Sequence, residues 1–338
     1  MNKIEVVYKN LLQPSDDLVT DIAGIDGDII ILGVGGKMGP GLANVAKQAI
    51  AKAGISKKVI GVARFSEPGL QQRLQKDGIE TLNADLLNDD QLFALPEVKN
   101  VLYLAGTKFG TSGNEPFTWA MNAYLPGRVA QKFKNSRIVV FSTGNVYPLV
   151  PVVGGGATED VTPEPIGEYG QSCLGRERIF QYFASKHNTP VLIYRLNYAN
   201  DVSYGVLMEI AKSVKENKPI DLAMGTASVI WQGDANEIAI RALNHCSVPA
   251  KILNVTGPET VSLRWLADQF GKMLGITPEF INEEQPTSFL SNAAESFRLF
   301  GYPKVTLKQM MELVLEWMKQ GGKTLNKPTH YSERKGKY

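Results

Sequence analysis

Short runs of hydrophobic residues alternate along the chain with longer segments whose apolar positions recur with a helical period. The short runs are apolar at nearly every position, which is typical of central parallel strands covered by helices on both faces. The predicted strands are residues 28–33, 57–63, 100–106, 136–142 and 189–196. The predicted helices are residues 39–53, 116–133, 168–185, 234–245, 262–274 and 308–319. This order predicts an α/β fold with a doubly wound parallel sheet.

The composition mainly excludes classes of protein and of site. The 338 residues, 43% of them hydrophobic, can bury a sizeable core, and a net charge of +2 creates no field that would recruit nucleic acid. No run approaches the roughly 18 apolar residues of a membrane span, so we expect a cytoplasmic protein with a small-molecule partner. Cys173, Cys246 and the scattered histidines have no ligand-like spacing, so no metal site is predicted.

The strongest local motif is a glycine-rich turn, ILGVGGKMGPGLA, between the first predicted strand and a helix. Gly33, Gly36 and Gly39 have the spacing G-x-x-G-x-x-G, which lets the backbone and the helix N-terminus approach a pyrophosphate. A dinucleotide is the expected ligand, and the alternative is a turn without a ligand. Lys37 and Met38 belong to the same cofactor-binding loop, where Lys37 either contacts phosphate or is solvated.

The residue at the tip of the second predicted strand is Arg64. A guanidinium at this position suits a 2′-phosphate, whereas a carboxylate would suit a free ribose hydroxyl, so NADP is favoured over NAD. The alternative is an ordinary solvated arginine. Asp85 follows the next strand-like run and is expected either to contact the adenine edge or to cap the following helix.

Together these motifs resemble the extended short-chain dehydrogenase/reductases, also called the NAD-dependent epimerase/dehydratase family. The resemblance spans about residues 28–317 and implies a Rossmann sheet with a smaller C-terminal substrate lobe. It rests on the glycine motif, the pair Asp85 and Leu86, the LAG motif at Leu104, Ala105 and Gly106, FSTGNVY at 141–147, and Tyr169 with Glu177 eight residues later. Weaker similarities are Arg195 with Asn197, WQGDA around Asp234, and NVTGPE at 254–259. The glycine motif, Arg64, Asp85-Leu86 and LAG are the implied cofactor-binding residues.

The resemblance also implies two catalytic residues, Thr143 and Tyr169. In this family a Ser or Thr hydroxyl holds the substrate oxygen, and a Tyr phenol exchanges the proton of a substrate hydroxyl. An unperturbed Tyr titrates at about 10, so a nearby positive charge is needed to ionise it at neutral pH. The family usually places a Lys four residues after the Tyr, but this chain has Cys173 there.

Three interpretations of Cys173 remain open at this stage. In the first, another cation acts in place of the Lys, and Arg176, three residues after Cys173, is the candidate catalytic residue. In the second, Tyr169 or Thr143 serves a less demanding reaction and the thiol only packs. In the third, hydride chemistry is lost and the protein is a dinucleotide sensor or scaffold.

The substrate-side residues are less specific. Members of the family that act on nucleotide sugars carry an Arg before the Asp of the WQGDA motif, and residues 225–234 contain no basic residue, which favours a smaller substrate. Asn197, Tyr198 and Trp231 are candidate substrate contacts beside Thr143, with lobe packing as the alternative for each. The basic tail is expected either to be mobile or to fold back, through Pro328, Thr329, His330 and Tyr331, over the cleft or a partner subunit.

The resulting prediction is an NAD(P)-dependent oxidoreductase or epimerase that transfers hydride on a small sugar, sugar derivative or hydroxy acid. A catalytically impaired sensor or scaffold is the alternative, and a homodimer is left open. The expected parts are an N-terminal extension (1–27), packed outside the sheet, an NAD(P)-binding Rossmann domain (28–196), a mainly substrate-binding lobe with interspersed segments (197–320), and a basic tail (321–338).

Overall fold

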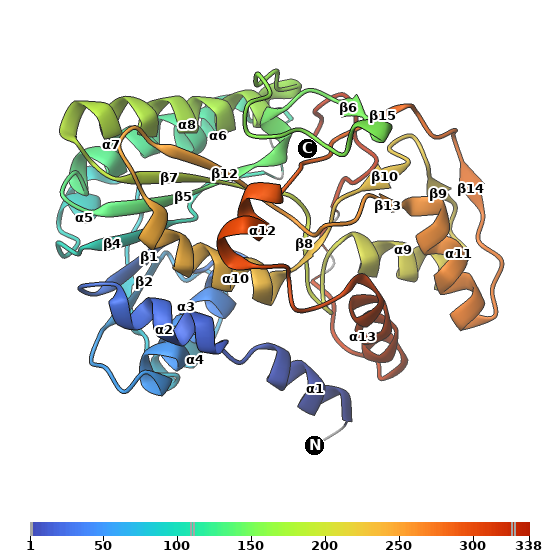
Figure 1. Cartoon of the computed structure of the whole chain (residues 1–338), viewed down its shortest axis with the longest axis horizontal. Coiled ribbons are helices and arrows are strands. Elements are labelled where there is room, and N and C mark those ends of the chain that lie inside the picture. The colour runs from blue at the N-terminus through green and yellow to red at the C-terminus, as the bar shows by residue number, and fades with distance from the viewer. Residues whose placement is uncertain (1–2, 109, 111, 326, 328) are drawn as a thin grey trace.

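Seven parallel strands form one central sheet in the computed structural model, which describes residues 3–108, 110, 112–325, 327 and 329–338 (Figure 1). The strand order is β12-β7-β5-β4-β1-β2-β3, and every neighbouring pair is parallel. The strands are β1 (Ile29–Leu32), β2 (Val59–Ala63), β3 (Glu80–Asn83), β4 (Asn100–Tyr103), β5 (Arg137–Thr143), β7 (Val191–Leu196) and β12 (Lys251–Val255). The doubly wound α/β prediction is confirmed.

Helices cover both faces of this sheet, as its apolar strands require. One hydrophobic cluster joins the sheet to α2 (Asp16–Gly24), α3 (Gly39–Lys52), α4 (Leu70–Lys76) and α10 (Gln232–Arg241). The cluster on the other face joins it to α5 (Asp89–Phe93), α7 (Leu125–Lys132) and α8 (Gly167–His187). The predicted helix 116–133 is three segments: α6 (Glu115–Trp119), a π-helical turn (Ala120–Tyr124) and α7.

A smaller lobe lies at the carboxyl ends of the strands and has its own core (Figure 1). Its helices are α9 (Val206–Lys215), α11 (Leu263–Leu274) and α13 (Leu307–Lys319), while α12 (Ala294–Phe300) lies beside β12. Short two-residue strands complete it: β8 (Ala199–Asn200), β9 (Ile220–Asp221), β10 (Thr226–Ala227), β11 (Ile230–Trp231), β13 (Val261–Ser262) and β14 (Phe280–Ile281), with β6 (Val150–Pro151) pairing β15 (Thr287–Ser288) at its edge. In the sequence, lobe segments alternate with segments of the sheet layer, because α10 and β12 lie between elements of the lobe but belong to the sheet layer.

The first residues form two helices, α1 (Lys3–Leu11) and α2. Ser15 caps α2 and also donates its hydroxyl hydrogen bond to Glu237 of α10, at 2.6 Å. Tyr8 of α1 donates to Asp201 at 2.8 Å and packs edge-on against Trp231 in the lobe core. The N-terminal segment therefore contacts both the sheet layer and the lobe.

The basic tail folds back, and the expectation of a mobile tail is wrong for its described residues. Thr329, Tyr331 and Tyr338 are each less than 8% exposed. Thr329 donates backbone and hydroxyl hydrogen bonds to Glu209, and Arg334 donates to the Thr287 carbonyl at 2.6 Å. Pro328 lies outside the described residues. In the described part of the chain, no helix is long and apolar enough to cross a membrane, and no His, Cys, Asp and Glu cluster could hold a metal ion.

Candidate active site

The glycine-rich loop between β1 and α3 leaves no room for side chains. Gly33 has a φ of +92°, and a Cβ there would lie 2.8 Å from the Ala105 backbone nitrogen. A Cβ on Gly39 would lie 2.2 Å from the Val34 carbonyl oxygen. Helix α3 begins without a side-chain cap: the Gly39 N–H donates to the Gly36 carbonyl, Pro40 has no N–H, and the Leu42 N–H donates to the Met38 carbonyl. A close backbone approach beside a helix N-terminus fits a dinucleotide pyrophosphate.

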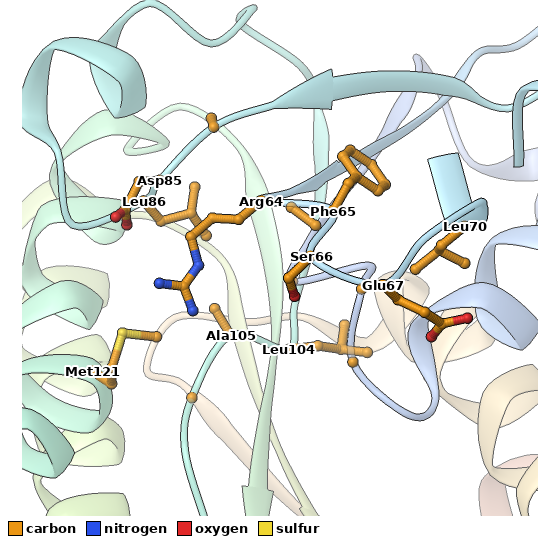
Figure 2. A pocket seen from close by; sticks show the side chains of 16 residues that line it. Arg64, Phe65, Ser66, Glu67, Leu70, Asp85, Leu86, Leu104, Ala105 and Met121 are labelled. Carbon is orange, nitrogen blue, oxygen red and sulfur yellow. The ribbon is translucent and has the colours of Figure 1, made fainter. Parts of the chain in front are cut away.

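A cavity of about 230 Å³ opens beside this loop at the ends of β2 and β3. Figure 2 shows the Arg64 guanidinium extended into it, with Asp85 and Leu86 on one side and Met121 opposite. The predicted cofactor residues that line it are Gly33, Gly36, Arg64, Asp85, Leu86, Leu104, Ala105 and Gly106. The positive charge of Arg64, at the end of β2, therefore faces the space in which the adenosine ribose of a dinucleotide would fit.

Asp85 does not cap the following helix. The N-cap of α5 is Asn88, whose side chain accepts the Gln91 N–H, while Asp85 accepts the N–H of Leu87 two residues on. The helix-capping interpretation of Asp85 is wrong, because Asn88 already occupies the cap. Asp85 remains in the cavity wall.

A larger cavity of about 520 Å³ lies between the sheet and the lobe, and shares Gly36, Leu104 and Gly106 with the first. Its wall brings together residues from the glycine loop, the ends of β4, β5 and β7, the start of α8, the lobe and the tail. The predicted site residues that line it are Lys37, Met38, Thr143, Tyr169, Asn197 and Tyr198. The two cavities thus meet at the loop after β1.

Tyr169 and Thr143 both line this wall, and the Thr143 hydroxyl is near enough to the phenol to affect its pKa. Thr143 ends β5, and its hydroxyl also donates to the Asn145 side chain at 2.9 Å. Burial raises the pKa of the Tyr169 phenol well above its usual value. The positive charge of Arg176 and the nearby Thr143 hydroxyl lower it. The pair predicted from the sequence is therefore assembled, in a setting where the phenolate needs stabilisation.

Cys173 is fully buried and packs against Tyr169 rather than facing solvent. Burial raises the pKa of its thiol, so the side chain is neutral and weakly reactive. The thiol therefore supplies neither a charge nor a nucleophile.

Arg176 lies beneath the loop that follows β4. Its guanidinium donates to the Phe141 carbonyl and to the Asn122 side chain, both at 2.7 Å, while its Nε has no hydrogen-bond partner. A Cβ on Gly106 would lie 2.3 Å from Arg176 Nη2, so the glycine makes room for this contact. Arg176 therefore combines a positive charge near Tyr169 with a positioning contact to the β4 loop.

Asn122 completes the contact between Arg176 and the loop after β4, and no motif in the sequence indicated a role for Asn122. Its side chain accepts the Thr107 N–H and donates to the Thr107 carbonyl, both at 2.9 Å. The π-helical turn places Asn122 between the β4 loop and α8, where it also donates to Ser172. The loop that carries LAG is therefore held by Asn122, which is itself held by Arg176.

A second buried group supports the site from behind. Glu177 of α8 accepts three hydrogen bonds from Arg195 of β7, at 2.6 to 3.2 Å, and one from Ser142 of β5. Arg195 also donates to the Tyr147 hydroxyl at 2.7 Å. Glu177 and Arg195 were both recognised in motifs, but only the fold joins them as an ion pair, at 0% and 1% exposed.

Two lysines line the larger cavity. The ammonium of Lys37 lies 3.5 Å from the Ala199 carbonyl oxygen and 3.5 Å from the centroid of the Tyr204 ring, on the lobe side of this cavity. Lys108 was not predicted, although it follows LAG by two residues. Its ammonium lies over the rings of Tyr338 and Tyr169, 4.8 and 5.7 Å from their centroids.

The predicted substrate contacts divide into two groups. Asn197 and Tyr198 line the larger cavity, and Asn197 is fixed by a hydrogen bond to the Phe289 carbonyl at 3.3 Å. Trp231 is 1% exposed in the lobe core, against Tyr8, and is not part of the cavity wall. The substrate-contact interpretation of Trp231 is therefore wrong, because apolar packing in the lobe covers its ring.

Comparisons with known proteins agree with this architecture. The model of the NAD dependent epimerase/dehydratase family matches residues 29–255, more than half of the chain. No curated protein matches significantly.

Several solved structures have a similar fold. UDP-glucuronic acid 4-epimerase from Bacillus cereus, with UDP-glucuronic acid and NAD, has a TM-score of 0.70 at 20% identity, covering 87% of this chain and 99% of that one. UDP-glucose 4-epimerase from Thermotoga maritima, with UDP-glucose, gives 0.69 at 15% over 87% and 99%. MoeE5, with UDP-glucose and NAD, gives 0.68 at 16% over 87% and 99%. At these identities the likeness establishes the fold.

The buried ion pair leads to a stability prediction. Glu177→Ala leaves Arg195 buried without its carboxylate, so we expect a loss of about 3–5 kcal/mol in the free energy of unfolding. Urea unfolding followed by circular dichroism measures it. Glu284→Ala, which breaks an exposed pair with Arg264, is the matched control and should change stability far less. Equal effects of the two substitutions would contradict the supporting role of Glu177.

Proposed function

Since the chain belongs to the NAD-dependent epimerase/dehydratase family, we propose that it transfers hydride between NAD(P) and a small sugar, sugar derivative or hydroxy acid, as an oxidoreductase or epimerase. The observation that carries this proposal is that Tyr169 and Thr143 lie together in the wall of a cavity that also borders the glycine-rich loop. A binding-only protein would have no need of an acid/base pair there. This argument favours catalysis over the sensor or scaffold alternative.

The glycine-rich loop and the N-terminus of α3 would hold the pyrophosphate of the dinucleotide, and the LAG segment would border the space beside it. When bound, the dinucleotide supplies the acceptor and donor of hydride. In the oxidative direction, Tyr169 Oη takes the hydroxyl proton while the carbon gives up hydride, so that the C–O single bond becomes a carbonyl. Thr143 Oγ1 holds the same oxygen. In the reductive direction, Tyr169 returns the proton.

The absent active-site Lys requires another source of positive charge near the phenol. Arg176 fits this role, since its charge lowers the pKa of Tyr169 against the larger effect of burial. Its hydrogen bonds to Phe141 and Asn122 hold the guanidinium in place. Arg176 would therefore stabilise the Tyr169 phenolate from a position fixed by hydrogen bonds.

Two features favour a substrate smaller than a nucleotide sugar. The lobe segment 225–234 has no basic residue for a diphosphate. Tyr338 of the tail packs edge-on against the Tyr169 ring, with centroids 5.3 Å apart, and its hydroxyl accepts a hydrogen bond from Asn145. The tail thereby occupies space beside the catalytic phenol.

Cofactor choice follows from Arg64, the exposed cation at the end of β2, and we propose NADP as the preferred cofactor. Arg64→Asp should weaken NADPH at least about tenfold more than NADH, because it replaces attraction of the 2′-phosphate with repulsion. Calorimetric titration of both cofactors measures this. Arg178→Asp, an exposed change on α8, is the control. Wild-type preference for NADH would refute the assignment.

Tyr169→Phe should reduce turnover by about 10²- to 10⁴-fold, because the phenol that exchanges the substrate proton is lost and the Thr143 hydroxyl only holds the substrate oxygen. Dinucleotide binding should stay nearly unchanged, since the phenol acts on the substrate. Cofactor-absorbance assays and calorimetry measure the two quantities, and thermal melts confirm folding. Full activity in this variant would reject the mechanism.

Removing the charge of Arg176 should move the oxidative rate profile to higher pH. Arg176→Gln keeps a donor for Phe141 but loses the charge, so ionising Tyr169 costs about 1.4 kcal/mol more for each unit of pKa increase. Arg176→Lys keeps the charge and should restore much of the wild-type profile. The measurement is the pH dependence of hydride transfer. An unchanged pH profile in Arg176→Gln would contradict this role of Arg176 and favour a less demanding reaction, one that does not need an added positive charge to ionise Tyr169.

A further inference from the structure

The tail is fixed to the lobe before it reaches the active site. It passes β15 and continues to the start of α8 (Figure 1). The Arg334 guanidinium donates to the Ala223 carbonyl at 3.1 Å, and to the carbonyl and hydroxyl oxygens of Thr287 at 2.6 and 2.7 Å. Three hydrogen bonds from one side chain therefore anchor the tail four residues before Tyr338.

Two glycines then let the tail lie directly against α8. Gly336 and Gly167 both have left-handed backbones, with φ of +73° and +76°. A Cβ on Gly167 would collide with the Gly336 carbonyl, and a Cβ on Gly336 would collide with the Ile166 carbonyl. The two main chains therefore touch with no side chain between them, two residues before Tyr169 and two residues before Tyr338.

This path places Tyr338 beside the catalytic pair. Its ring packs edge-on against the Tyr169 ring, with centroids 5.3 Å apart, and the residue is only 6% exposed. Its hydroxyl accepts a hydrogen bond from the Asn145 side chain, whose oxygen accepts from the Thr143 hydroxyl at 2.9 Å. A buried aromatic ring whose hydroxyl has a partner is a stable cover for an apolar surface.

We propose that Tyr338 is a positioning residue of the active site: its ring covers Tyr169 and keeps bulk water from the phenol, so that the phenol exchanges its proton with the bound substrate. Excluding water also strengthens the electrostatic interactions within the site. The proposal rests on the proposed function for the role of Tyr169, whereas the cover itself can be tested without a substrate.

The titratable groups that face Tyr169 come from three parts of the chain. Cys173 and Arg176 lie on α8, and Tyr338 belongs to the tail. Lys108, from the segment after β4, has its ammonium 5.7 Å from the centroid of the Tyr169 ring. Burial is the largest cause of the raised pKa of Tyr169, and burial also raises the pKa of Tyr338. Tyr338 is therefore neutral and acts through the space that its ring fills.

Nitration with tetranitromethane at pH 8 tests the cover, because this reagent attacks accessible phenolates. Tyr302 and Tyr182, 72% and 59% exposed, are internal standards, and mass spectrometry of peptides gives the rate at each site. Tyr338→Ala should speed the nitration of Tyr169 at least about tenfold relative to these standards, which corresponds to one unit of pKa. Tyr338→Phe keeps the ring and should leave this nitration slow.

A second pair of variants displaces the tail without changing Tyr338. The side chain of Gly336→Val should collide with the start of α8, so that Tyr169 is nitrated as fast as in Tyr338→Ala. Lys337→Val adds the same side chain at the next, exposed position, and it is the matched control in which Tyr169 should stay protected. Thermal melts confirm that each variant is folded.

The pH dependence of hydride transfer is a readout that a purely structural residue would not change. Water that reaches the phenol stabilises its ionised form, so the pKa of Tyr169 falls. Tyr338→Ala should therefore move the oxidative rate profile to lower pH, opposite to Arg176→Gln, while its maximum rate falls about tenfold or more. Tyr338→Phe should leave the profile in place, and dinucleotide affinity should stay unchanged in both variants.

Three results would overturn the proposal: equal nitration of Tyr169 with and without the Tyr338 ring, an unmoved rate profile in Tyr338→Ala, or a higher maximum rate in that variant. The last would make the tail an inhibitory contact. Faster nitration in Tyr338→Ala, combined with no hydride transfer by the unmodified protein to or from any sugar or hydroxy acid, would support the cover and count against the proposed function.

Discussion

The buried carboxylate of Glu177 is the constraint on which the active-site geometry depends. A charge with no exposure must be paired, and Glu177 meets this requirement through Arg195 and Ser142, on two adjacent strands of the sheet. The pair fixes α8 along the sheet, since a shifted helix would leave the carboxylate buried alone. Tyr169, eight residues earlier on α8, is thereby held beside Thr143 at the end of β5.

Replacing the usual Lys by Cys173 changes how positive charge reaches the phenol rather than removing it. A lysine four residues after the Tyr would lie on the same helix and reach directly into the cavity. Here Arg176 approaches from beneath the β4 loop and is held by Phe141 and Asn122. The same loop carries Lys108 into the wall of the larger cavity.

The tail and the N-terminal helices act as connections between the sheet and the lobe. Tyr8 joins α1 to Asp201 and to the Trp231 ring, and Tyr338 joins the tail to Asn145 beside the catalytic pair. The larger cavity is bordered by both of these layers.

The amino-acid sequence by itself determined the apolar strands and the glycine loop, because each is encoded in a short contiguous pattern, whereas Thr143 and Tyr169 were identified through the resemblance to the family. It indicated β3 only as a strand-like run before Asp85, because the residues of this edge strand are largely polar, and it did not reveal β12, which follows the expected start of the lobe. The core position of Trp231 and the positions of Lys37 and Lys108 in the cavity wall were decided only by tertiary structure. The contact between Asn145 and Tyr338 joins residues 193 positions apart, and no local periodicity or propensity encodes such a pairing.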